Sequence, residues 1–290
     1  MSVMRFGVGL SPAVGPGRDP VGFARHAEEL GYDFVSTSDH PSGSTPTYET
    51  WTLLTWVAAA TSRIRIATRV LGIPYRSPAM VAKMAETLHR LSDGRLILGL
   101  GGGYSDDEFR AFGLGVPTPR EKVDGLVDTL HILRGLWSQP RFSHHGPRYR
   151  VEEADLEPKP RSPIPIWLGT YGPRALDATG RLADGWIPSY GFAPPHDAVH
   201  MRDRIHAAAA DAGRDPSDIT CVYNVPIWID GPASAPGTVT GPASAITDRL
   251  LELAGLGFTS MNFMLPEDDA RAQAERLAGD VLPALRSATA

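Results

Sequence analysis

An acidic side chain and an imidazole stand side by side where an apolar segment ends. Residues 34–37 are Phe-Val-Ser-Thr, and Asp39 and His40 follow after one serine. A histidine can transfer a proton near neutral pH, and a neighbouring carboxylate can orient it. A structural interpretation stands beside this one, in which Asp39 accepts hydrogen bonds from loop amides and His40 lies nearby without a role. Taken alone, the two residues are compatible with both the catalytic and the structural interpretation.

A glycine-rich turn follows the apolar residues 96–100. It contains Gly101, Gly102 and Gly103, followed by Tyr104. The dinucleotide-binding pattern GxGxxG fails, because Tyr104 takes the place of its last glycine, and no Gly-Lys-Ser/Thr phosphate loop occurs. Without side chains, these glycines let the backbone come close to a flat ligand or to a neighbouring strand.

A third candidate is a turn that leads from an apolar segment into a proline-started helix. Its residues are Gly169, Thr170, Tyr171, Gly172 and Pro173, with Arg174 directly behind them. Free amides at a helix N-terminus and an arginine suit a phosphate group. The alternative is an ordinary turn between a strand and a helix.

Other kinds of site are not expected. A single cysteine excludes a disulfide framework and a CxxC metal site, no GxSxG serine-hydrolase motif is found, and no metal site is predicted. The net charge is −5 without a run of basic residues, so a nucleic-acid partner is not expected. No apolar run of 18 residues or signal-peptide core occurs, which predicts a cytoplasmic protein that does not span a membrane.

Strand-like and helix-like segments alternate through the 290 residues and place the three candidates at comparable positions. The predicted strands cover 6–10, 34–37, 64–70, 96–100, 164–169, 184–188, 220–225 and 258–263. The predicted helices cover 20–30, 49–61, 77–91, 121–137, 173–183, 195–212, 243–254 and 269–285. Eight such pairs predict a single (β/α)8 TIM-barrel domain over 1–290, with a hairpin inserted before the fifth strand and a loop (230–242) after the seventh. A doubly wound open sheet is the alternative.

Several of these segments resemble the bacterial luciferase-like superfamily of flavin- and deazaflavin-dependent oxidoreductases. The resemblance rests on residues 38–40, 73–78, 91–104, 108–109, 165–169 and 183–186, which occur in the family's order. It implies a barrel that holds an isoalloxazine-type ring at its C-terminal mouth. Asp39 and His40 would lie beside the reactive edge of the ring, and the turn from Gly101 to Tyr104 would line the ring and the substrate.

Two further parts of the cofactor site follow from the resemblance. A non-proline cis peptide near Arg69-Val70 would lie under the ring. The turn formed by Gly169, Thr170, Tyr171, Gly172 and Pro173 would hold the cofactor phosphate.

The resemblance favours coenzyme F420 over FMN as the cofactor. It implies an oxidoreductase that moves a hydride between F420 and a small, fairly apolar organic substrate, with His40 as proton donor or acceptor. One alternative is an FMN-dependent monooxygenase that uses O2 and a separate flavin reductase as partner. A second alternative is a flavin-binding barrel without catalytic activity. Members of the family are often homodimers, so a homodimer is expected.

The chain departs from the sugar-phosphate dehydrogenases that it resembles. These enzymes carry a glutamate where this chain has Tyr104, and they use lysines in the second half of the chain, where no lysine follows Lys159. Glucose 6-phosphate is therefore not the expected substrate. Four aromatic residues would make an apolar pocket instead, or belong to the core: Trp51, Trp186, Tyr190 and Phe192.

Overall fold

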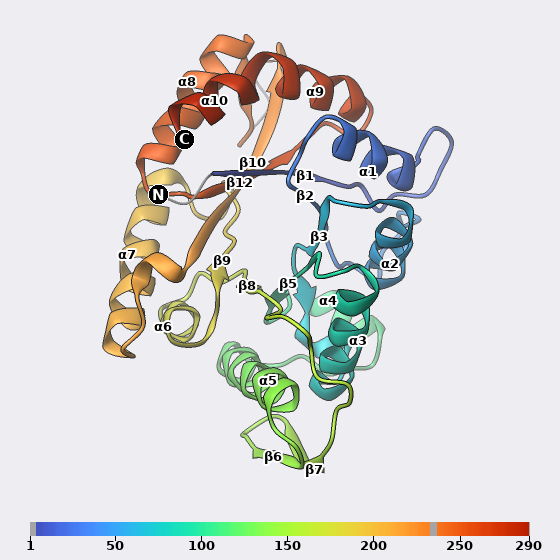
Figure 1. The fold of residues 1–290 in the computed structure, drawn as a ribbon, viewed down its shortest axis with the longest axis vertical. Helices are drawn as coiled ribbons and strands as arrows, with labels where there is room; N and C mark the ends of the chain where they lie inside the picture. Colours follow the sequence, from blue (N-terminus) through green and yellow to red (C-terminus); the bar gives the residue numbers. More distant parts are fainter. Residues whose placement is uncertain (1–3, 233–236, 290) are drawn as a thin grey trace.

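Eight parallel strands close into a barrel in the computed structural model, which describes residues 4–232 and 237–289 (Figure 1). The barrel strands are β1 (Arg5–Gly9), β2 (Phe34–Thr37), β3 (Arg65–Thr68), β5 (Leu96–Gly101), β8 (Ile166–Leu168), β9 (Gly185–Trp186), β10 (Thr220–Ile229) and β12 (Ser260–Met264). The pairing of β10 with β9 completes the ring, with Thr220 opposite Gly185. The predicted (β/α)8 barrel is confirmed, and the open sheet is excluded.

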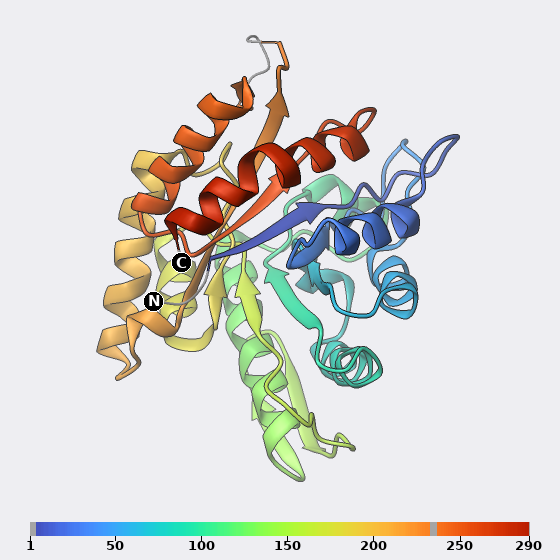
Figure 2. The same ribbon diagram turned by 45° about the horizontal axis from the view of Figure 1, so that its top comes forward.

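Helices cover the outside of this barrel, as seen in two orientations (Figures 1 and 2). They are α1 (Pro20–Glu29), α2 (Thr50–Ala60), α3 (Pro78–Leu91), α4 (Asp106–Ala111), α5 (Pro119–Ser138), α6 (Pro173–Leu182), α7 (Pro195–Asp211), α8 (Ala243–Gly255), α9 (Ala270–Arg276) and α10 (Leu282–Ala288). A π-helical turn, η3 (Leu277–Val281), joins the last two, and short 3-10 turns lie at η1 (Ile73–Tyr75) and η2 (Pro216–Asp218).

Local sequence sets the beginnings of several helices. The Asp19 side chain accepts a hydrogen bond from the Gly22 amide at 2.8 Å, and Pro20 occupies the first position of α1. Thr118 and Glu121 form a reciprocal capping box at the start of α5. The short helix α4 was not among the predicted elements, because six residues are too few to show a helical period.

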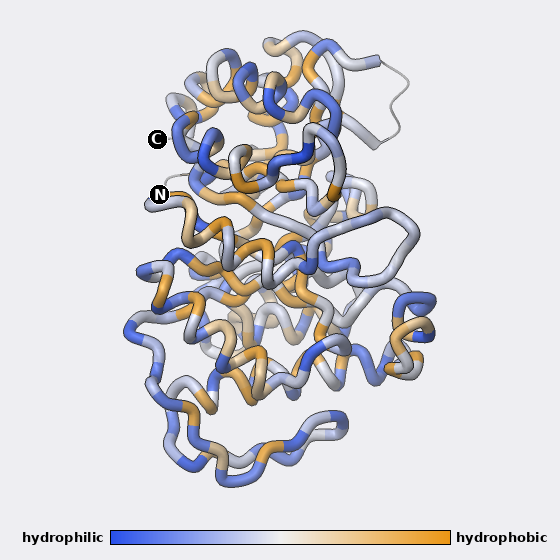
Figure 3. The backbone as a smooth tube through the Cα atoms, turned by 90° about the vertical axis from the view of Figure 1, so that its right-hand side faces the viewer, coloured by the Kyte–Doolittle hydropathy of each residue, from blue (hydrophilic) through white to orange (hydrophobic). Residues whose placement is uncertain are grey.

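The apolar core is divided between the barrel interior and the space between barrel and helices. Phe34, Ala67, Ile97 and Trp167 are among the buried residues that fill the interior. A larger cluster packs between the strands and the helices. In Figure 3 the hydrophobic stretches accordingly concentrate toward the middle of the molecule. Alternate strand residues face the two sides, which is why each strand is apolar on both faces.

A polar layer lies within the barrel on top of the apolar interior. Ser36 donates to Asn262 Oδ1 at 2.9 Å, and Asn262 Nδ2 donates to Asn224 Oδ1 at 2.9 Å. Asn224 in turn donates to the Pro188 carbonyl at 3.1 Å. All three of these side chains are buried, and each has a partner, so the barrel changes here from an apolar to a polar interior.

The two insertions are more structured than a simple loop. The predicted hairpin is β6 (Phe142–His145) with β7 (Arg150–Ala154), which lies against α5. The seventh strand extends to Ile229, and part of the segment predicted as a loop forms β11 (Val239–Gly241), which pairs in parallel with β10. The backbone pairing of Ile227 with Val239 lies beyond residue 225, where the predicted seventh strand ended.

Asp128 of α5 anchors the hairpin. Its buried carboxylate accepts hydrogen bonds from the amides of Arg148 (2.7 Å) and Tyr149 (2.9 Å) and lies 3.1 Å from His144 Nε2. The His144 side chain is therefore turned toward α5 and is largely shielded from solvent. Within the described ranges, no helix is both long enough and apolar enough to cross a membrane.

Candidate functional site

A cavity of about 520 Å³ opens at the carboxyl ends of the barrel strands. Its walls come from the loops after β2, β3, β5, β8, β9 and from β10, and they consist of Ser38, Asp39, His40, Arg69, Val70, Gly72, Tyr75, Gly101, Gly102, Gly103, Tyr104, Glu108, Gly169, Tyr171, Ile187, Ser189, Phe192 and Asn224. Parallel strands bring all these loops to one end of a barrel, where binding sites of this fold lie. The volume is in the usual range for a small-molecule site.

One wall of the cavity is apolar and is formed by a valine between two glycines. The peptide bond Arg69-Val70 is cis, as the family resemblance implied. Val70 packs against two glycines: a Cβ on Gly101 would lie 2.7 Å from Val70 Cγ2, and one on Gly169 would lie 3.1 Å from it. These glycines therefore leave room for Val70, and together the three residues present an apolar surface to the cavity.

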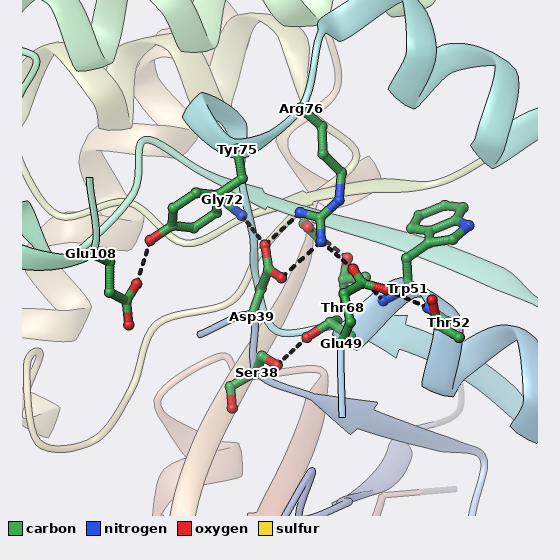
Figure 4. A network of polar contacts seen from close by, with 12 residues as sticks. Ser38, Asp39, Glu49, Trp51, Thr52, Thr68, Gly72, Tyr75, Arg76 and Glu108 are labelled. Atoms are coloured by element: carbon green, nitrogen blue, oxygen red, sulfur yellow. Dashed lines mark hydrogen bonds and ion pairs between the residues drawn. The ribbon is translucent and has the colours of Figure 1, made fainter. Parts of the chain in front are cut away.

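Asp39 is held in place by two neighbours and is almost completely buried. Its carboxylate accepts hydrogen bonds from Arg76 Nη1 (2.8 Å) and Nη2 (3.1 Å) and from the Gly72 amide (2.9 Å) (Figure 4). Its side chain is 1% exposed. Burial alone lowers the pKa of Arg76, but Asp39 and Glu49 raise it overall. This arrangement joins the loop after β2 to the short strand β4 (Leu71–Gly72) and the residues that follow it.

Glu49 completes this network from the start of α2. Its carboxylate accepts hydrogen bonds from the amides of Trp51 (3.1 Å) and Thr52 (2.7 Å) and also pairs with Arg76. Burial raises the pKa of Glu49, but the amides of Thr52 and Trp51, together with Arg76, lower it overall. The charged carboxylate is therefore the form that stabilises the fold.

This pKa shift gives a pH-dependent prediction for Glu49→Gln. Because the folded-state pKa is lowered, the stabilisation is complete above the ordinary value of 4.5 and is lost as the pH falls through the lowered value. At neutral pH we expect the variant to lose about 1 kcal/mol or less of unfolding free energy, since Glu49 is 41% exposed. Urea denaturation at a series of pH values should show this difference shrink toward zero in acid.

Glu152→Gln is the control for that series. Glu152 is exposed on β7 and has no ion pair among the described residues, so its replacement should change stability little at any pH. A Glu49→Gln difference that grew on acidification would contradict the assigned role.

The carboxylate beside the imidazole of His40 belongs to Glu108. Glu108 Oε1 lies 3.0 Å from His40 Nδ1, and its other oxygen accepts a hydrogen bond from the Tyr75 hydroxyl. Burial and the contact with Glu108 raise the pKa of Tyr75, so it remains a donor. Asp39 makes no contact with this imidazole, because its oxygens are engaged by Arg76 and Gly72. Of the two alternatives, that Asp39 or a neighbouring group orients His40, the first is therefore corrected, and the group in contact with the imidazole is Glu108.

Glu108 was named in the sequence only as part of the family resemblance. It lies on α4, directly after the glycine turn, and its amide is capped by Ser105 Oγ at 3.3 Å. The side chain is 11% exposed, while that of His40 is 50% exposed. The available sequence signal was a serine followed by acidic residues after a glycine turn, which is typical of a helix start at the rim of the barrel.

Aromatic side chains form the outer lip of the cavity. Tyr104 and Phe192 are 74% and 60% exposed, with ring centroids 5.8 Å apart. Phe192 also contacts Tyr171 at 5.8 Å, and Tyr104 meets His40 edge-on at 6.5 Å. These rings give an incoming molecule an open apolar surface.

The aromatic pocket expected from the sequence is only partly present. Of its four residues, only Phe192 lines the cavity. Trp51 is buried on α2, Trp186 stacks on Phe258 in the core, and the Tyr190 hydroxyl accepts a hydrogen bond from Arg249 at 3.2 Å.

The predicted phosphate turn lies next to the cavity and contributes to it in part. Gly169 and Tyr171 line it, whereas Thr170, Gly172 and Pro173 do not. The Thr170 hydroxyl is buried and hydrogen-bonded to Thr179 at 2.8 Å, and Gly172 and Pro173 begin α6. Arg174 pairs with Asp124 at 2.8 Å. The role of the turn from Gly169 to Pro173 in holding a phosphate stays a prediction.

Comparison with known proteins places this geometry in a family. Residues 2–236 match the model of the luciferase-like monooxygenases. The chain belongs to this family. The match includes the cavity walls from Ser38 to Asn224, so the predicted family membership is confirmed.

Metal chemistry was not expected for this chain. Across 4–232 and 237–289, no group of three or more His, Cys, Asp or Glu side chains is arranged to hold an ion.

Several proteins that this chain resembles carry the names of F420-dependent enzymes. An F420-dependent glucose-6-phosphate dehydrogenase of Kineococcus radiotolerans is 37% identical over 58% of this chain and 51% of its own length, so the chain spans about half of that relative. An enzyme of the same name from Intrasporangium calvum is 27% identical over 93% of this chain and 95% of its own length. A solved F420-dependent secondary alcohol dehydrogenase, in complex with an F420-acetone adduct, shares the fold with a TM-score of 0.87, 18% identity, and coverage of 98% and 99% of the two chains.

Proposed function

We propose that this chain is an F420-dependent oxidoreductase that acts on a small, fairly apolar organic substrate. The observation that carries the proposal is the His40–Glu108 pair at the edge of the cavity at the barrel mouth. The names of the relatives support the cofactor, and the family match supports the same placement of the site.

The cavity fits a planar ring system. Val70, Gly101 and Gly169 offer one apolar wall, and a side chain on either glycine would push Val70 away. When bound, coenzyme F420 would supply a ring carbon that accepts or donates a hydride. The residues of the chain would then position the ring, exclude water and handle the proton that accompanies the hydride.

His40 is suited to move that proton. Since Glu108 accepts from Nδ1, the imidazole is held in the orientation that leaves Nε2 free to give or take a proton. Its Nε2 has no hydrogen-bond partner among the described residues, and half of the side chain is exposed toward the cavity entrance. Glu108 itself is oriented by Tyr75, so the pair is positioned before substrate binds.

The lining of the cavity supports an apolar substrate rather than a sugar phosphate. Its exposed rings are Tyr104 and Phe192, and no lysine is among the lining residues. Tyr104 stands where the resemblance places a glutamate, so Glu108 is the acidic side chain that accompanies His40 here. The homodimer and a reductase partner stay predictions.

Equilibrium titration of the purified protein with F420 and with FMN tests the cofactor. We expect F420 to bind at least tenfold more tightly than FMN. Quenching of the deazaflavin fluorescence would report the binding of F420. Tight binding of FMN alone would favour the monooxygenase alternative and contradict the proposal. F420 binding without turnover of any alcohol or carbonyl compound in a broad panel would favour a binding protein.

A further inference from the structure

Arg69 projects into the barrel mouth from the end of β3. Side chains alternate along this strand: Ile66 packs in the outer core, Ala67 in the barrel interior, and Thr68 turns outward to donate to the Gly99 carbonyl at 2.6 Å. The next side chain therefore points inward, and Arg69 is one of the residues that line the cavity.

The guanidinium of Arg69 has no partner in the part of the chain that the structure describes. Its Nε is buried without a hydrogen bond, and the side chain makes no ion pair. Burial lowers the pKa of Arg69 to about 10, against a small opposing effect of Tyr171, so the group is still a cation at neutral pH.

The two carboxylates that line the same cavity are already engaged. Asp39 is paired with Arg76, and Glu108 is shared by His40 and Tyr75. Neither carboxylate contacts Arg69, so no ion pair within the described residues neutralises this cation. Arg69 is half-buried in the cavity wall with its Nε buried, and a cation in such a place is stabilised by a bound counter-charge. The partner that this cation lacks is expected to arrive with a ligand.

We propose that Arg69 binds a carboxylate of the substrate, so that the substrate is a small organic acid with an apolar body. This proposal rests on the proposed oxidoreductase function and specifies its substrate class. A single planar guanidinium matches a carboxylate through two parallel hydrogen bonds. A phosphate dianion would leave charge unbalanced, since no second uncommitted Lys or Arg among the described residues lines the cavity. The apolar body would lie against the rings of Phe192 and Tyr104.

Phenylacetate and its neutral isostere phenylacetamide provide a direct test. Ligand-observed NMR titrations would give both dissociation constants, with and without saturating F420. We expect the wild type to prefer the carboxylate by about tenfold or more, corresponding to one well-placed charged contact. Arg69→Met should abolish this preference while it leaves phenylacetamide binding unchanged, and Arg69→Lys should retain part of it.

Arg65→Met is the matched control. Arg65 lies on the same strand, and burial likewise lowers its pKa to about 10, but it lines a separate cleft at the amino end of the barrel. The Arg65→Met substitution removes the same charge from the chain as Arg69→Met. The Arg65→Met variant should therefore prefer phenylacetate to the same degree as the wild type. Thermal unfolding of each variant would show that the fold is intact.

Three results would overturn the proposal. The first is equal binding of the two ligands by the wild type, and the second is a preference that survives in Arg69→Met. The third is a preference that vanishes when F420 binds, together with more than tenfold weaker F420 binding by Arg69→Met, which would assign the cation to the cofactor. Failure of the wild type to bind F420 would refute the proposed function separately, because the carboxylate preference is also measured without cofactor.

Discussion

His40→Ala is expected to lower kcat by about 10²–10⁴-fold, the usual contribution of a positioned acid or base. The substrate for this measurement is any compound that the wild type oxidises or reduces with F420. Binding of F420 should remain within a few-fold of the wild-type value, because the apolar wall of the cavity is formed by Val70, Gly101 and Gly169. The loss should therefore appear in turnover and not in cofactor affinity.

A second variant tests the role of Glu108 through the imidazole. Glu108→Gln keeps the shape of the side chain but removes the charge that faces His40 Nδ1 at 3.0 Å. We expect a smaller loss of kcat than for His40→Ala, because the imidazole remains but its orienting carboxylate is replaced by a neutral amide. A merely structural contribution of Glu108 would change stability and leave kcat at the wild-type value.

His26→Ala is the control for both variants. His26 on α1 also pairs with a carboxylate, Glu275 Oε1, at 2.7 Å, but lies away from the cavity. Its replacement should leave kcat unchanged. Unaltered turnover in His40→Ala would rule out the proton-transfer role and favour a binding function for the pair.

Asp39→Ala is expected to lower the unfolding free energy by about 3 kcal/mol, because it leaves the guanidinium of Arg76 without its buried partner. The Gly72 amide loses its acceptor in the same step. Chemical denaturation monitored by tryptophan fluorescence would measure the effect. The double variant Asp39→Ala/Arg76→Met should recover part of the loss, since it removes the unpaired charge as well.

A surface pair of similar geometry provides the comparison. Asp177 accepts two hydrogen bonds from Arg204, both at 2.8 Å, but both side chains are partly exposed. Water can replace such contacts, so Asp177→Ala should be far less destabilising. Equal losses in Asp39→Ala and Asp177→Ala would show that burial is not what makes the first pair important.

The two residues that stand together in the sequence thus have separate roles. Asp39 connects the loops after β2 and β3 through Arg76 and Gly72, whereas His40 faces the cavity and pairs with Glu108. The structural interpretation of the pair, which competed with the catalytic one at the level of sequence, applies to Asp39, and proton transfer by His40 stays a proposal.

The sequence alone determined the architecture and the position of the site. Alternating apolar segments and helix signals such as Asp19-Pro20 are local, so they predict eight strand–helix units without any knowledge of contacts. Parallel strands then bring their carboxyl ends to one rim, which places His40, the Arg69-Val70 bond and the turn at Gly101 in one cavity. Family resemblance supplied the cis peptide at that bond.

Only the tertiary structure decided which side chains meet within that cavity. His40 and Glu108 are 68 residues apart, and Asp39 and Arg76 are 37 apart, so no local pattern pairs them. Side-chain packing likewise turned the Thr170 hydroxyl toward Thr179. That Arg69 has no partner among residues 4–232 and 237–289 is also decided by the fold, because a charge is unpaired only relative to the groups that surround it.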